Sequence, residues 1–130
     1  MKTTICLFGE AEKGDFGCPI FCRSLAHLAD SLGNPPQESL GIFYAIQALL
    51  YQRELLFCRV REEGFSTKDY MQGLKHLQNQ TSKLQAIVIP GVGDTEIIEA
   101  ALSTCSLYKS LLILTEKDLY DYLTNREAIA

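Results

Sequence analysis

The chain has 130 residues, of which 47% are hydrophobic and 22% are charged, and its net charge at pH 7 is −4. This length and composition predict one globular domain that spans residues 1–130. The negative charge argues against nonspecific binding to nucleic acid or to an anionic membrane. No run reaches the roughly 18 uninterrupted apolar residues of a membrane span.

The cysteines and the N-terminus bear on the cellular location. The five cysteines are odd in number, and most of them lie inside apolar runs, which indicates a reducing compartment rather than a disulfide framework. Acidic residues interrupt the short apolar run near the N-terminus, so this run does not have the form of a signal peptide. We therefore expect a cytoplasmic protein.

In chain order, the first expected elements are a strand and a helix joined by a glycine-rich loop. The apolar run 3–8 predicts a strand. The loop 9–17 contains three glycines among three acidic residues. Pro19 suits the first turn of a helix, which we expect to open at Cys18 and to continue to Leu32, with Gly33 as its C-cap.

The middle of the chain predicts two helices around a second strand. Two prolines, Pro35 and Pro36, exclude helix and strand alike, and the next helix is expected to start near Ser39. The apolar run 55–60 predicts a strand that ends in charged residues. A more polar helix is expected over residues 67–80.

The stretch 84–102 contains the clearest local pattern. An unbroken apolar run, 86–89, predicts a strand covered on both faces, and the turn 90–93 ends it. Asp94 or Thr95 is expected to cap the helix that follows. A last strand over 111–115 and a short helix over 117–123 complete the chain, with a frayed tail from Thr124.

Strands that alternate with helices predict an α/β fold with a parallel sheet and right-handed crossovers. We expect a small Rossmann-like three-layer sandwich with about four parallel strands and helices on both faces. In such a sheet, loops 9–17 and 90–95 emerge at the same edge, where ligands bind. The sequence therefore predicts a cleft between these two loops.

The charges of the two loops restrict what such a cleft can bind. Both loops are acidic, and Lys13 is the only cation in either of them, so a polyphosphate is disfavoured. The turn 90–93 also fits neither a Walker motif nor a dinucleotide fingerprint. Sugar hydroxyls, a cationic group or a divalent ion would suit the cleft better. The alternative is that the glycines only form a turn and the acids only cap a helix.

A few further residues have a functional and a structural interpretation. Cys18 at a helix start is either a nucleophile or a structural residue, and the structural role is favoured because His27 is too far along the helix to be its base. His76 could be the base for Cys18 only if another helix brought it close. No zinc site is expected. The cysteines in apolar runs are expected to be packing residues, namely Cys6, Cys58 and Cys105. The tyrosines near the C-terminus are expected to form either a dimer patch or contacts within the monomer, and the second is favoured. These tyrosines are Tyr108, Tyr120 and Tyr122.

The turn 90–99, with sequence PGVGDTEIIE, resembles the hallmark Pro-Gly-Gly-x-Gly-Thr-x-x-Glu of the Lonely Guy-type phosphoribohydrolases. Three positions coincide: Pro90, Gly91 and Thr95. Two glycines are replaced, by Val92 and Asp94, and the acid falls one residue late, at Glu99. The resemblance implies a nucleotide-binding Rossmann fold related to that of nucleoside deoxyribosyltransferases.

Other parts of the chain are similar to this family in order and spacing. Gly41 and Ala45 match a second family motif, but its glycine triplet is replaced by 36–38, and Lys75 stands where the family has an arginine. The departures fall on the glycines that would admit a phosphate and on charged catalytic positions. They predict that nucleotide monophosphate chemistry is lost or changed in this chain.

Together these observations predict a protein that binds a nucleoside- or nucleotide-like small molecule in the cleft. The expected ligand-binding residues are Gly9, Glu10, Gly91, Gly93, Asp94 and Thr95. If the protein hydrolyses an N-glycosidic bond, Glu96 or Glu99 is the expected acid. No metal or cofactor is expected, and a homodimer is one expected assembly. The competing hypothesis is a non-catalytic protein–protein interaction domain that keeps the fold without an active site.

Overall fold

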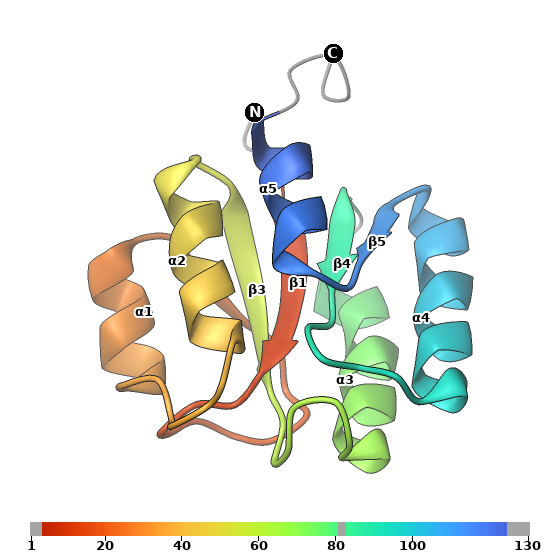
Figure 1. Ribbon diagram of the computed structural model, residues 1–130, viewed down its shortest axis with the longest axis horizontal. Helices are drawn as coiled ribbons and strands as arrows, with labels where there is room; N and C mark the ends of the chain where they lie inside the picture. The colour runs from red at the N-terminus through yellow and green to blue at the C-terminus, as the bar shows by residue number, and fades with distance from the viewer. Residues whose placement is uncertain (1–3, 81–82, 125–130) are drawn as a thin grey trace.

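A five-stranded, mostly parallel β-sheet forms the centre of the structure, a computed structural model that describes residues 4–80 and 83–124 (Figure 1). The strands are β1 (Thr4–Gly9), β2 (Ile20–Cys22), β3 (Glu54–Arg59), β4 (Ala86–Val88) and β5 (Leu111–Ile113). They are arranged in the order β2-β3-β1-β4-β5. Neighbours among β3, β1, β4 and β5 are parallel, whereas β2 is antiparallel to β3.

The α/β class and the mostly parallel sheet agree with the prediction, but the expected number of four strands was too small. Residues 20–22, expected in a helix, form the antiparallel edge strand β2, which pairs with residues 55–57 of β3. A strand of only three residues is too short to show a period in the sequence. Its pairing with a distant strand therefore overrides the local pattern.

In the part of the chain that the structure describes, five helices connect and flank the strands: α1 (Leu25–Leu32), α2 (Gly41–Leu50), α3 (Thr67–Gln80), α4 (Thr95–Tyr108) and α5 (Glu116–Thr124). The helix expected from Cys18 begins only at Leu25, because Ser24 caps it by accepting a hydrogen bond from the His27 N–H. The other helices start within two residues of their predicted positions. The tail was expected to fray from Thr124, but Thr124 is the last residue of α5, and the rest of that tail lies outside the described residues.

Alternating side chains of the sheet belong to two separate hydrophobic clusters. Ile5 and Leu7 of β1 pack with residues of α1, α2 and α5, whereas Cys6 and Phe8 pack with residues of α3 and α4. The three cysteines expected to be packing residues are buried free thiols in the second cluster, which confirms that prediction: Cys6, Cys58 and Cys105. Burial raises the pKa of each of these thiols.

The tyrosines near the C-terminus do not form one patch. Tyr108 packs beside the α3–α4 cluster and donates a hydrogen bond to the Leu77 carbonyl, whereas Tyr122 is buried in the other cluster. Only Tyr120 is largely exposed. Contacts within the monomer, the favoured interpretation, are therefore confirmed for Tyr108 and Tyr122.

Within residues 4–80 and 83–124, no helix is both long enough and apolar enough to cross a membrane.

Candidate functional site

The strand order defines where a ligand site is expected. The chain passes from β1 to β3 on one side and to β4 and β5 on the other, so its direction across the sheet reverses next to β1. Open α/β sheets bind ligands at the carboxyl ends of their strands, at such a reversal point. Three loops meet there in Figure 1, namely 10–19 after β1, 60–66 after β3 and 89–94 after β4.

A carboxylate of the chain itself occupies the start of α2 at this edge. Glu63 accepts hydrogen bonds from the backbone N–H groups of Glu10 at 2.9 Å, Leu40 at 2.8 Å and Gly41 at 2.9 Å. The Glu10 carboxylate in turn accepts one from the Glu63 N–H at 3.0 Å. Helix N-termini are the positions where anions bind, because their N–H groups are free and carry the positive end of the helix dipole. Glu63 therefore fills the anion position of α2.

Gly9, an expected ligand-binding residue, is packed directly against the backbone of α2. A Cβ atom at Gly9 would lie 2.6 Å from the Gly41 Cα, and one at Gly41 would lie 2.7 Å from the Gly9 Cα. No real Cβ atom tolerates so short a contact with backbone. The two glycines thus let the end of β1 and the start of α2 touch, which closes this part of the edge.

The loop after β1 is organised around Arg59. Its guanidinium donates hydrogen bonds to the carbonyls of Ala11 at 3.1 Å and Gly14 at 2.6 Å. The same guanidinium lies 4.2 Å from the centroid of the Phe16 ring, and that of Arg61 lies 4.3 Å from it. Such cation–π contacts contribute about 0.5–1 kcal/mol each where they are exposed. The loop 9–17 is therefore held by contacts within the protein.

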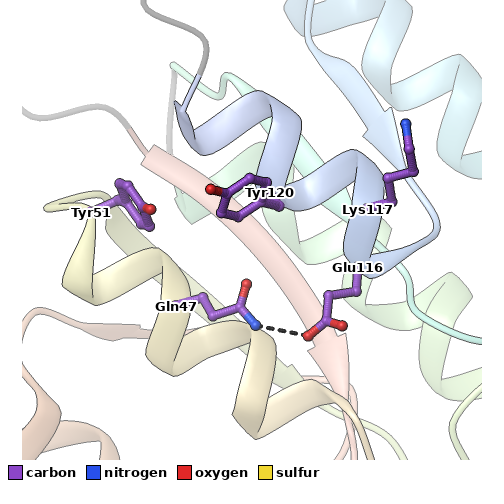
Figure 2. Close-up of a pocket in the computed structure, with 5 residues that line it drawn as sticks. All are labelled: Gln47, Tyr51, Glu116, Lys117 and Tyr120. Atoms are coloured by element: carbon purple, nitrogen blue, oxygen red, sulfur yellow. Dashed lines mark hydrogen bonds between the residues drawn. The ribbon is translucent and has the colours of Figure 1, made fainter.

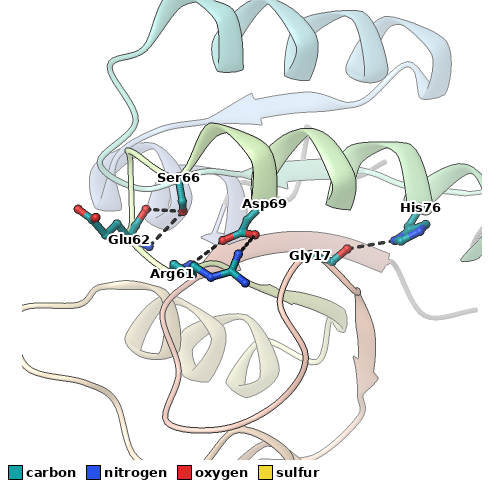
Figure 3. A network of polar contacts seen from close by, with 6 residues as sticks. All are labelled: Gly17, Arg61, Glu62, Ser66, Asp69 and His76. Carbon is teal, nitrogen blue, oxygen red and sulfur yellow. Dashed lines mark hydrogen bonds and ion pairs between the residues drawn. The ribbon is translucent and has the colours of Figure 1, made fainter.

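Figure 3 shows the polar network that continues from Arg61. Arg61 pairs with Asp69 at 2.8 Å, and the Asp69 side chain is almost fully buried. Further along α3, the His76 Nδ1 lies 3.0 Å from the Gly17 carbonyl oxygen. This network joins the 10–19 loop to α3, so Arg61, Asp69 and His76 have structural partners.

The turn 62–66 contacts both loops that were expected to face each other. Besides the Glu63 contacts with Glu10, a Cβ at Gly64 would lie 2.5 Å from the Gly91 carbonyl oxygen. The Gly64 N–H donates to the buried Tyr70 hydroxyl at 2.7 Å, and Ser66 closes the turn by hydrogen bonding to the Glu62 backbone. Burial raises the pKa of the Tyr70 hydroxyl. The turn is thus fixed over the end of β1.

The loop after β4 is open by contrast. A Cβ built at Gly91 or at Gly93 would meet no atom within 4 Å. Asp94 caps α4 as predicted, because its Oδ1 accepts hydrogen bonds from the N–H groups of Glu96 at 2.8 Å and Ile97 at 3.4 Å.

The remaining expected residues of this loop lie on or beside α4. Thr95 is the first residue of the helix, and Glu96 and Glu99 are exposed on it. The structure therefore gathers one set of predicted residues, Gly91, Gly93, Asp94, Thr95, Glu96 and Glu99, along one loop and helix. It joins the other set, Gly9 and Glu10, to Glu63 instead.

Sequence reasoning missed Glu63 and Arg59. Arg59 lies inside the expected strand 55–60, and Glu63 lies in the charged segment 61–64, which was interpreted only as the end of that strand. A run of charges at the carboxyl end of a parallel strand could have indicated that they serve the neighbouring loops. Nothing local, however, indicates which backbone groups they contact.

The other candidate residues show no catalytic arrangement. Cys18 lies before β2 and not at a helix start, and His27 is exposed on α1. In the described part of the chain, no three His, Cys, Asp or Glu side chains are grouped as metal ligands would be.

A groove lies elsewhere, between α2 and α5. It has a volume of about 530 Å³ and is lined by Gln47, Tyr51, Glu116, Lys117 and Tyr120 (Figure 2). The Gln47 side chain donates a hydrogen bond to the Glu116 carboxylate at 3.0 Å and links the two helices. Sequence reasoning missed this groove, although one signal for it is present: residues 39–52 contain no charged side chain.

Comparisons with protein-family models, with curated proteins and with solved structures each find no match to this chain.

Proposed function

We propose that this chain is a protein–protein interaction domain on a Rossmann-like three-layer fold, with the face formed by α2 and α5 as its binding surface. The observation that carries this proposal is the uncharged helix α2. A helix that is hydrophobic all round is normally covered all round. In the monomer, however, its outer side chains are exposed, Phe43 by 52% and Leu50 by 64%. A partner would cover them.

The groove beside α2 supports the same surface. Tyr51 and Tyr120 line it, and Tyr120 is exposed by 55%. Tyrosine is enriched at the centres of protein interfaces, because its ring buries a large apolar area while its hydroxyl finds a polar partner. Contiguous exposed apolar residues that are rimmed by polar ones are typical of interaction sites.

The closed end of β1 also favours an interaction domain over an enzyme. Glu63 holds the N–H groups at the start of α2, and Gly9 packs against Gly41. A ligand above β1 would have to displace both contacts. The free thiol state of all five cysteines fits action in the cytoplasm, which is a reducing compartment.

Site-specific photo-crosslinking in the cells that produce the protein tests this proposal. A benzophenone amino acid replaces Leu50 on α2 or, as the matched control, Leu107 on α4, which is exposed by 70% on the other side of the sheet. We expect position 50 to give discrete protein adducts that position 107 does not give. Adducts of equal yield and identity from both positions would contradict the proposal.

A second candidate function, the binding of a nucleoside-like small molecule with N-glycosidic hydrolysis, has one observation in its favour. The Cα atoms of Gly91 and Gly93 face open space on the side where a side chain would stand, so a ligand could approach them closely from that side. Glu96 or Glu99 on the adjoining helix would then supply the acid, and Asp94 and Thr95 would contact the ribose.

Thermal unfolding with a panel of nucleosides and nucleotides tests the second candidate. A ligand at 100 times its Kd raises the free energy of unfolding by about 2.7 kcal/mol, which is a measurable increase in Tm. The increase should disappear in the variant Asp94→Ala, which removes a side chain expected to contact the ribose. If no compound in the panel raises Tm, this second candidate is wrong.

A further inference from the structure

We infer that the α2–α5 face binds an amphipathic helix of a partner protein, and that the polar side of that helix is basic. This inference rests on the proposed function and specifies the partner. It is drawn from three features of the face. The first is the spacing of the residues along α2, and the second is the sign of the charges beside them. The third is that Lys117, the cation on α5, is already paired and is therefore not free to bind a second copy of the chain.

The spacing of the exposed and half-buried residues on one side of α2 is that of a helix-binding surface. Phe43, Gln47, Leu50 and Tyr51 follow one another at intervals of four, three and one residues and form a stripe about 12 Å long. Helix α5 lies next to α2, and a hydrogen bond between Gln47 and Glu116 joins the two helices (Figure 2). A third helix packs into a groove of this kind by placing its own ridge of residues between the two helices.

The charges beside the stripe are mostly acidic. Helix α2 has no charge, and α5 carries Glu116, Asp118 and Asp121 against one cation, Lys117. A further cation, Arg53, follows α2, where it donates to the Tyr51 carbonyl and lies against the Tyr122 ring of α5. Lys117 already pairs with Asp121 at 3.3 Å. Among the described residues, Glu116 has no cationic partner and accepts only from the neutral Gln47 amide. A partner helix with lysines or arginines on its polar side would supply the missing positive charge.

A second copy of the chain is a poorer occupant of the same face. It would present the same uncharged α2 and the same acidic α5. Its Lys117 is already paired with Asp121, and its Arg53 is already held by the Tyr51 carbonyl and the Tyr122 hydroxyl. Like charges brought together across an interface are unfavourable and select against such a pairing. The charge distribution therefore favours a different, basic partner.

Three designed peptides test this inference. Each is about 18 residues long and has leucines at helical spacing, and the three differ only in their polar residues, which are lysine, glutamine or glutamate. A fourth peptide, the control, has the composition of the lysine peptide in a scrambled order and therefore has no apolar stripe. Amide shifts of the isotopically labelled protein locate the binding. We expect the lysine peptide to shift α2 and α5 and to bind at least about tenfold more tightly than the glutamine peptide. The glutamate and scrambled peptides should not bind there.

Matched variants sharpen the result. Leu50→Glu should abolish binding of the lysine peptide, whereas Leu107→Glu on α4 should leave it unchanged. The double variant Glu116→Lys with Asp121→Lys should reverse the preference, so that the glutamate peptide binds instead. The control Glu96→Lys with Glu99→Lys makes the same change of net charge on α4 and should not reverse it.

The outcomes separate this inference from the proposed function. If the scrambled lysine peptide binds equally well, or if the shifts concentrate on α4, the helix inference is wrong. It is also wrong if light scattering shows a dimer that Leu50→Glu dissociates. If crosslinking at position 50 captures a partner while no basic helical peptide binds, the interaction domain stands and only the partner class is wrong.

Discussion

The loops that follow β1 and β4 lie at the same edge of the sheet, and both contain glycine, but their surroundings are opposite. Gly9 is in contact with the backbone of Gly41 and beneath the Glu63 carboxylate, whereas a Cβ atom at Gly93 would have no neighbour within 4 Å. Glycine at the end of a strand therefore has two distinct uses. It lets one part of the chain approach another, as at Gly9, or it leaves the backbone accessible, as at Gly93.

The largest expected effect follows from adding one methyl group to each loop. Gly9→Ala places a Cβ 2.6 Å from the Gly41 Cα and must move α2 away from β1, so we expect a loss of about 2–3 kcal/mol in the free energy of unfolding. Gly93→Ala meets open space at an ordinary φ and should change it by less than about 0.5 kcal/mol. Urea unfolding measures both. Equal losses would show that the two loops are not packed differently.

The next effect isolates the carboxylate that closes the first loop. Glu63→Ala leaves three backbone N–H groups, those of Glu10, Leu40 and Gly41, without their acceptor. We expect a loss of about 2 kcal/mol in the free energy of unfolding, because partly buried donors lose charge-assisted hydrogen bonds.

The control for that change is Glu96→Ala, which removes an exposed carboxylate from the first turn of α4 and should cost only about 0.3–1 kcal/mol. Amide hydrogen exchange adds a local measurement. Faster exchange at Leu40 and Gly41 in Glu63→Ala is expected, and unchanged exchange there would mean that Glu63 does not cap α2.

The two loops also differ in how far the sequence predicts them. The Asp94 cap is local, because the side chain accepts from N–H groups two and three residues later, and the sequence predicted it. Glu63 reaches Glu10 over 53 residues and Gly41 over 22 residues, and no pattern within a short window encodes such a partner. The part of the candidate site that depends on long-range contacts was therefore missed.

The same distinction explains the errors in the fold. The longer apolar runs identified β1 and β3 within a residue or two, because burial on both faces leaves a continuous apolar signal. Strand β2 exists because Ile20 and Cys22 pair with β3, and its three residues carry no period of their own. The α2–α5 groove was missed because the sequence pattern indicates a helix but not which of its apolar side chains stay exposed, as Phe43 and Leu50 do.

The smallest expected effect compares the open loop with a helix start that has no proposed ligand. Asp94→Ala removes the cap of α4, and Ser24→Ala removes the equivalent cap of α1. Each should cost about 1 kcal/mol in urea unfolding, because each side chain satisfies N–H groups that would otherwise be free. If Asp94 serves only as a cap, the two losses match. If Asp94→Ala instead costs clearly less than Ser24→Ala, the Asp94 carboxylate stabilises the start of α4 less than its hydrogen bonds to the Glu96 and Ile97 N–H groups indicate, and this prediction is wrong.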